Sequence, residues 1–141
     1  MPNREAHKIF GTVTGAVTAV SYGYYKEQNF ENAWQFALGG GLGGYLTSTL
    51  ADKLEPATSP NHRCIFHGVA LNGVLTIKAY EPTKNWLQSL VDKANEYDVR
   101  QEPFKAFLYR LAVGLVIGGV GGYASHLTAD SMTTRSLPLI C

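Results

Sequence analysis

The sequence predicts an all-α protein, a compact bundle of about four to five helices that is rich in glycine and associated with a membrane. Four weakly polar stretches are separated by polar segments, and none of them alternates polar and apolar residues over a useful length. Charged residues make up 16% of the chain, below the roughly 25% of soluble domains. Glycine accounts for 15 of the 141 residues. A chain of this length is expected to form a single domain, 1–141, around one core.

The first two stretches predict the first two helices of the bundle. Phe10–Tyr25 carries no charge and places Gly11 and Gly15 four residues apart, which favours a helix, although its threonines and valines would also tolerate a strand. The second stretch runs from about Glu31 to Ala51. Within it, Asn32–Ala51 is 20 residues without a charge, just long enough to cross a bilayer as a helix.

The second half of the chain predicts three more elements. Cys64–Ala79 is apolar but short, and is expected to form a buried core helix rather than a membrane span. The charge-rich segment Glu81–Glu102 has apolar residues at helical spacing, which predicts an amphipathic helix that begins near Pro82. The last helix is expected to follow Pro103 and to contain Leu111–Leu127, 17 residues without a charge.

Glycines concentrate in the second and fourth stretches. They form the segment 39–44, of which five residues are glycine, and a series at Gly114, Gly118 and Gly122. Such spacing lets a neighbouring backbone approach closely. Two interpretations stay open: close helix crossing within a compact bundle, or direct insertion into the bilayer. Aromatic residues around the first interhelical turn suit a membrane interface and equally the end of a core.

The charge balance excludes one class of partner. The chain has 12 Lys and Arg against 11 Asp and Glu, a net charge of +1, which lacks the excess of a dedicated nucleic-acid binder. No nucleic acid is therefore expected as a partner. Membrane lipid and a second copy of the chain are the expected partners.

The polar residues that border the apolar stretches are the candidate site. These are His7, His62, His67 and His126 with the carboxylates Asp52, Glu55 and Asp130. His126 and Asp130 are four residues apart and would share one helix face, and so would Asp52 and Glu55 if their helix extends that far. Imidazole and carboxylate without thiolate suit a catalytic zinc, manganese or ferrous site. A lone histidine is more often a core or surface residue, so the interpretation depends on the grouping.

Two segments resemble a known family. Residues 52–68 contain an acidic pair before a proline, then His-Arg and Phe-His-Gly, and they resemble the first signature of the bacterial inner-membrane-associated metal-dependent hydrolases, the YdjM-like group. Residues 122–134 resemble its second signature, Gly-Tyr-x-Ser-His-x-x-x-Asp-x-x-Thr. The ending 137–140 is similar, and His7 matches a histidine that the family places before its first helix. The resemblance covers essentially the whole chain apart from residues 81–102.

The chain departs from the family pattern at three places. Ala51 stands where the family usually has proline, Phe66 and His67 lack the residue that separates them in the family, and Gly68 replaces a serine. None of these changes removes one of the seven candidate ligands. Gly68 does remove a hydroxyl that could orient a neighbouring ligand.

The resemblance implies an all-helical hydrolase-like protein at the inner membrane, with its active site facing the cytoplasm. It implies a divalent metal, zinc with manganese or iron as alternatives, held by His7, Asp52, Glu55, His62, His67, His126 and Asp130. A distant similarity to zinc-dependent phospholipase C points to phosphoester or lipid-like substrates. In that scheme Asp52 or Glu55 takes a proton from water, and Arg63 clamps an oxyanion. The alternative role of Arg63 is an ion pair with Asp52 or Glu55.

Other interpretations belong to different classes of protein. One is a non-catalytic small membrane protein that oligomerises through its glycine-rich helices. Another is a fold that binds a metal without turnover. The grouping of histidines and carboxylates in two ordered motifs favours the metal site, because oligomerisation does not require it.

Overall fold

The computed structural model describes residues 4–54 and 69–131, and these residues are helical almost throughout. The all-α prediction is confirmed for them. They form four long helices and one short helical segment: α1 (Arg4–Glu27), α2 (Ala33–Thr47), α3 (Leu50–Leu54), α4 (Val69–Val99) and α5 (Pro103–Ser131). The first stretch is a helix and not a strand, and the last helix begins at Pro103, as the sequence predicts.

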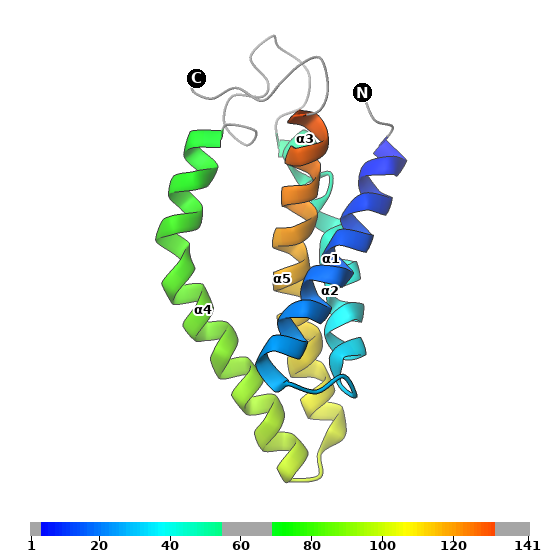
Figure 1. The fold of residues 1–141 in the computed structure, drawn as a ribbon, viewed down its shortest axis with the longest axis vertical. Helices are drawn as coiled ribbons and strands as arrows, with labels where there is room; N and C mark the ends of the chain where they lie inside the picture. Colours follow the sequence, from blue (N-terminus) through cyan, green and yellow to red (C-terminus); the bar gives the residue numbers. More distant parts are fainter. Residues whose placement is uncertain (1–3, 55–68, 132–141) are drawn as a thin grey trace.

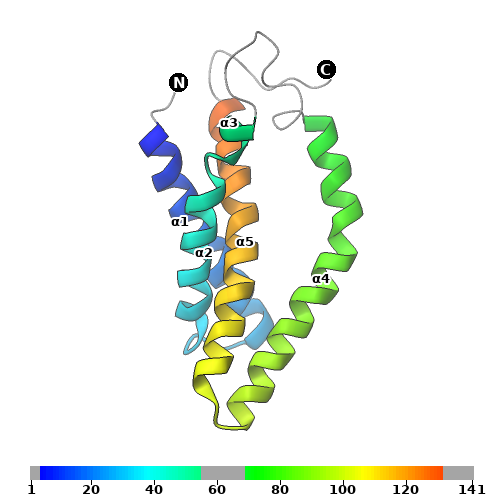
Figure 2. The ribbon, with the colours of Figure 1, turned by 180° about the vertical axis from the view of Figure 1, so that it is seen from behind.

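Helices α1, α2 and α5 pack together along their lengths, and α4 packs mainly on α5 (Figure 1). Since α5 runs antiparallel to α1, the beginning of α1 and the end of α5 lie at the same end of the bundle. From the opposite side the same arrangement is visible, with α4 diverging from the other helices toward that end (Figure 2). At its other end α4 is tied to α1, where Lys26 Nζ donates to Gln88 Oε1 at 2.6 Å.

One boundary predicted from the sequence is wrong. The helix expected to begin near Pro82 and the core helix expected over Cys64–Ala79 are, within the described residues, parts of one continuous helix of 31 residues, α4. Proline removes a backbone donor and crowds the preceding turn, which bends a helix without always ending it. Pro82 is exposed and lies outside the core. The helix accordingly continues through Pro82 along a bowed path (Figure 1).

The interior of the three-helix layer is backbone against backbone. A Cβ on Gly118 would lie 2.2 Å from the Gly40 carbonyl oxygen, and one on Gly44 would lie 2.0 Å from the Gly11 carbonyl oxygen. Real Cβ contacts are never this short, so glycine is required at these crossings. These contacts lie within one chain, which favours the compact-bundle interpretation of the glycines.

The surface of the same layer is strongly apolar. Large side chains on α1 and α2 are more than half exposed, including Val13 at 57%, Val17 at 60% and Leu38 at 54%. Small residues inside and large apolar residues outside reverse the usual pattern of a water-soluble bundle. Within the described residues, one helix, over Pro103–Asp130, is long and apolar enough to cross a membrane. By contrast, α4 carries charged residues from Lys78 onward.

The described hydrophobic core lies toward the α1–α2 turn, where α4 joins the layer. Phe36 of α2, fully buried, packs there with Ala19, Leu87, Val91 and Val113. The turn is fixed locally, because Asn29 Oδ1 accepts a hydrogen bond from the Glu31 backbone N–H at 2.8 Å. This core stabilises one end of the bundle. The polar residues described next lie at the other end.

Candidate functional site

Three of the seven predicted metal ligands meet at one end of the bundle. His7 of α1 and His126 of α5 are 119 residues apart in sequence, yet their Nδ1 atoms lie 3.2 Å apart. Asp130 Oδ2 lies 3.6 Å from His126 Nε2, and Asp130 Oδ1 lies 3.9 Å from His7 Nε2. All three side chains are at least 95% buried, with exposures of 5%, 1% and 2%. We call these three residues the His–Asp cluster.

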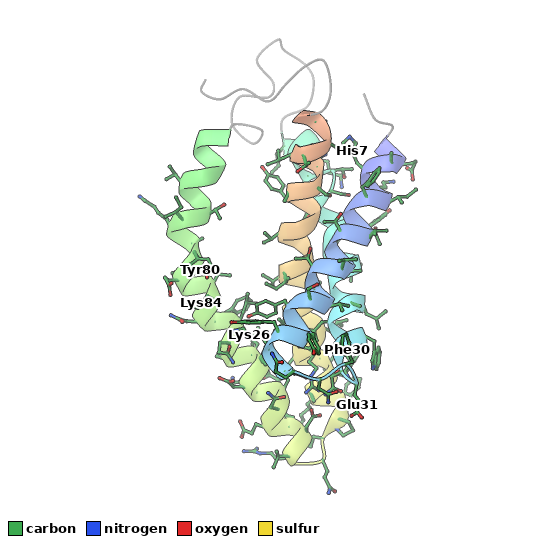
Figure 3. The ribbon with its side chains drawn as sticks, viewed as in Figure 1. His7, Lys26, Phe30, Glu31, Tyr80 and Lys84 are labelled. Atoms are coloured by element: carbon green, nitrogen blue, oxygen red, sulfur yellow. The ribbon has the colours of Figure 1, made fainter. Side chains whose placement is uncertain are left out.

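Helix geometry explains how the cluster forms. His126 and Asp130 occupy successive turns of the same face of α5, as their spacing predicts. His7 lies at the end of the first turn of α1, at the end of the bundle where α5 finishes (Figure 3). The antiparallel packing of α1 on α5 brings the two faces together. From the sequence, His7 was a candidate because it borders the first apolar stretch and because it matches a histidine of the family pattern.

The contact between the two rings constrains their protons. In the neutral rings, one histidine must carry its proton on Nδ1 and donate, while the other accepts through a bare Nδ1. The accepting ring then carries its proton on Nε2, the nitrogen that faces Asp130. Protons on both Nδ1 atoms would place two N–H groups against each other. The cluster therefore favours one asymmetric arrangement of protons, with the carboxylate beside it.

The donors of the cluster fit a divalent ion in kind, since two imidazoles and a carboxylate are common ligands of zinc. In this structure the two Nδ1 atoms lie within hydrogen-bond distance of each other, while the distances from the Nε2 atoms to the Asp130 carboxylate are longer, at 3.6 and 3.9 Å. Each ring faces the other through Nδ1 and the carboxylate through Nε2, and the residues described here include no group of three or more His, Cys, Asp or Glu arranged to hold a metal ion. A complete site therefore depends on further ligands.

The other four predicted ligands are the residues that would complete such a metal site. Asp52 belongs to the short helix α3, which follows α2 at the same end of the bundle, but its side chain is not described. Glu55, His62 and His67 lie outside the described residues, and so does Arg63. Their roles stay predictions.

Buried hydroxyl groups lie at the same end of α2. Ser48 is fully buried and Thr49 is 3% exposed. A Cβ on Gly11, one turn after His7, would lie 2.3 Å from Ser48 Cβ, so the end of α2 packs closely on the start of α1. The sequence analysis did not identify these two residues.

The sequence analysis also missed a second polar cluster, at the opposite end of the bundle. Arg110 of α5 is 1% exposed, and its Nε donates to Glu27 Oε1 at 2.7 Å. Its Nη2 donates to Asp98 Oδ2 at 2.5 Å and to Asn95 Oδ1 at 3.1 Å. A signal was available, because Arg110 is the last charge before the long uncharged segment of α5. The arginine joins α1, α4 and α5, which is a structural role.

Comparison with models of protein families, with curated proteins and with solved structures finds no match for this chain.

Proposed function

We propose that the protein is a metal-dependent hydrolase associated with a membrane, acting on a phosphoester or lipid-like substrate. The observation that carries the proposal is the convergence of His7 with His126 and Asp130. Two histidines and a carboxylate from opposite ends of the sequence are buried together at one end of the bundle, away from the ion pairs of Arg110 at the other end. Burying such groups is costly, and a packed bundle does not require it.

In this proposal each residue has a defined task. A bound divalent ion would act as a Lewis acid and activate water at neutral pH. His7 and His126 present ring nitrogens as ligands, and Asp130 fixes the orientation of the imidazoles. Asp52 or Glu55 accepts the proton of the attacking water, and Arg63 stabilises the negative charge that develops on the substrate. Zinc is the first candidate ion, with manganese and iron as alternatives.

The proposed membrane association is supported by the reversed distribution of side chains. The outer faces of α1 and α2 are apolar and α4 is charged from Lys78 onward, so we place the α1–α2 face against lipid and the charged part of α4 away from it. The candidate span in α5 agrees with this placement. The expected location is the inner membrane, with the active site on the cytoplasmic side.

The non-catalytic alternative requires the glycine-rich faces to contact other chains. Gly15, Gly40, Gly44 and Gly118 are instead in contact with one another inside a single chain. This favours the hydrolase over assembly through those faces.

The metal content of the purified protein tests the proposal. We would express the full chain with zinc, manganese and iron supplied, purify it without chelator, and measure moles of each metal per chain. The wild type is expected to hold about one or two equivalents. His126→Gln, which keeps a polar side chain of similar size, is expected to lose them. Thr128→Ala, which alters an exposed residue of the same helix, serves as the matched control.

A wild type without metal would overturn the proposal, provided that its circular dichroism spectrum is helical. Metal retained equally by His126→Gln and His7→Gln would overturn the assignment of the cluster. With metal present, phosphoester and phospholipid substrates are then screened for hydrolysis that depends on the same residues.

A further inference from the structure

A groove on the outer surface of the bundle is not used by the proposed reaction. It has a volume of about 560 Å³ and runs between α1 and α2. Its lining is formed by Thr12, Ala16, Ala37, Leu38, Gly41, Leu42 and Tyr45. The floor consists of small residues, since the nearest neighbours of a Cβ on Gly41 would be Thr12 Cγ2 at 3.6 Å and Ala16 Cβ at 3.8 Å. Unlike the buried glycines, Gly41 leaves space that nothing within the described chain fills.

The walls of the groove are apolar and open outward. Leu38, Leu42 and Tyr45 are each close to half exposed, at 54%, 49% and 45%. Residues 37–45 span about 12 Å along α2. This length suits the upper part of an extended hydrocarbon chain, and the groove opens on the same α1–α2 face that we place against lipid.

One end of the groove carries a cation. Lys8 lies one turn before Thr12 on α1, and its Nζ is 5.7 Å from the centroid of the Tyr45 ring. It also pairs with Glu5 Oε1 at 2.8 Å, and Glu5 is exposed, with 66% of its side chain accessible. An apolar groove that ends at an ammonium group is complementary to an amphiphile with an anionic head and an apolar tail.

We propose that this groove binds a phospholipid with an anionic headgroup, with one acyl chain along α1 and α2 and the phosphate at Lys8. Without lipid, the Lys8 ammonium group is paired with the Glu5 carboxylate. In the complex, the lipid phosphate replaces that carboxylate as the partner of Lys8. The inference rests on the membrane association proposed above but not on hydrolysis. Lys8 directly follows His7 in α1, so a bound headgroup is near the level of the His–Asp cluster.

The test measures lipid binding by the full chain. The protein is purified in a mild detergent and titrated with phosphatidylglycerol or with phosphatidylcholine, and lipid adducts are counted by native mass spectrometry. The wild type is expected to retain phosphatidylglycerol in preference to phosphatidylcholine. Ala16→Leu fills the floor of the groove and should abolish retention of both lipids. Val17→Leu, a neighbouring exposed residue outside the groove lining, is its control.

Two charge variants test the headgroup contact. Lys8→Gln should lower the affinity for phosphatidylglycerol by about fivefold and that for phosphatidylcholine by less, because the choline cation offsets the phosphate charge. Glu5→Gln removes the competing carboxylate and should raise the affinity for phosphatidylglycerol. Neither substitution is expected to change the metal content.

The outcomes separate this inference from the proposed function. Equal lipid binding by the wild type, Ala16→Leu and Lys8→Gln would overturn the groove assignment. The wild type could instead form dimers that carry no lipid and that Ala16→Leu disrupts. That result would assign the groove to a second copy of the chain and would also overturn the lipid assignment. Flotation of the wild type with vesicles of the two lipids is measured in parallel. If the wild type floats while the groove variants bind lipid normally, the groove assignment fails and the membrane association stands.

Discussion

Gly118 of α5 and Gly40 of α2 meet backbone to backbone, so that a Cβ on Gly118 would lie only 2.3 Å from the Gly40 Cα atom. No flexible side chain stands between them that could yield. An added methyl group must therefore push two helices apart, and every contact along that crossing is affected.

Gly118→Ala is expected to destabilise the fold. The methyl group raises helix propensity by about 1 kcal/mol, but overpacking against backbone costs about 1–3 kcal/mol and separates the helices. The control is Gly41→Ala, where the nearest atom is 3.6 Å away and the substitution should raise the free energy of unfolding by about 0.5–1 kcal/mol. Chemical denaturation in detergent measures both. Equal effects of the two substitutions would contradict the packing described here.

Arg110→Ala is expected to lower the free energy of unfolding by about 3–5 kcal/mol, because it leaves Glu27 and Asp98 near an empty buried site. Arg100→Ala removes an arginine from an exposed i,i+4 pair with Glu96 and should change the same quantity by less than about 1 kcal/mol. Thermal unfolding of both variants at matched ionic strength gives the comparison. A small effect at Arg110 would mean that its contacts do not hold α1, α4 and α5 together.

Adding zinc is expected to stabilise the wild type. An ion that binds the folded state alone contributes about 2.7 kcal/mol when it is present at one hundred times its dissociation constant. The rise in the unfolding midpoint should disappear in Asp130→Asn and persist in Ser125→Ala, which changes a residue one position before His126. A chelator should reverse the rise in the wild type. An identical response in all three proteins would show that the ion binds elsewhere.

Gln101→Gly is expected to stabilise the turn between α4 and α5. Gln101 has φ 59°, in the left-handed region, which costs a residue with a side chain about 1 kcal/mol. Glycine removes this cost and keeps the backbone hydrogen bond from the Glu102 N–H to the Tyr97 carbonyl oxygen at 2.9 Å. The unfolding midpoint should rise for Gln101→Gly and stay unchanged or fall for Gln101→Ala.

Val13→Glu should weaken vesicle binding without unfolding the protein. Val13 is 57% exposed on the face that we place against lipid, and a charge there opposes contact with hydrocarbon by about 2–3 kcal/mol. Asn85→Glu adds the same charge to an exposed position of α4 and should leave flotation unchanged. Equal loss of flotation in the two variants would indicate that net charge, rather than this face, governs binding.

Local features of the chain were predictable where a short-range rule applies. The start of α5 at Pro103 follows from the fixed φ of proline, and the shared face of His126 and Asp130 follows from their spacing. The continuation of α4 through Pro82 was not predictable in this way, because the contacts that sustain it come from the packing of its second half on α5. Local signals at Pro82 favour a boundary, and tertiary packing overrides them.

Long-range features of the site were harder to predict. Spacing alone could not bring His7 to His126, since that contact depends on how two distant helices cross. The ion pairs of Arg110 depend on the same crossing, joined by α4. The composition of the chain indicated close packing by glycine, but it could not show whether the partner helix belonged to the same chain.

The glycine crossing also fixes the axial register of α1 against α5. A Cβ on Gly15 would lie 2.9 Å from the Gly118 carbonyl oxygen, so α1 and α5 touch at that level. His7 precedes Gly15 by eight residues and His126 follows Gly118 by eight, and in antiparallel helices both steps lead about 12 Å toward the same end. Sliding one helix by a single residue, about 1.5 Å, would put the two imidazoles out of register. Gly15 and Gly118, which carry no side chain, thus fix the register that aligns the imidazoles of the His–Asp cluster, about 12 Å away along the helices.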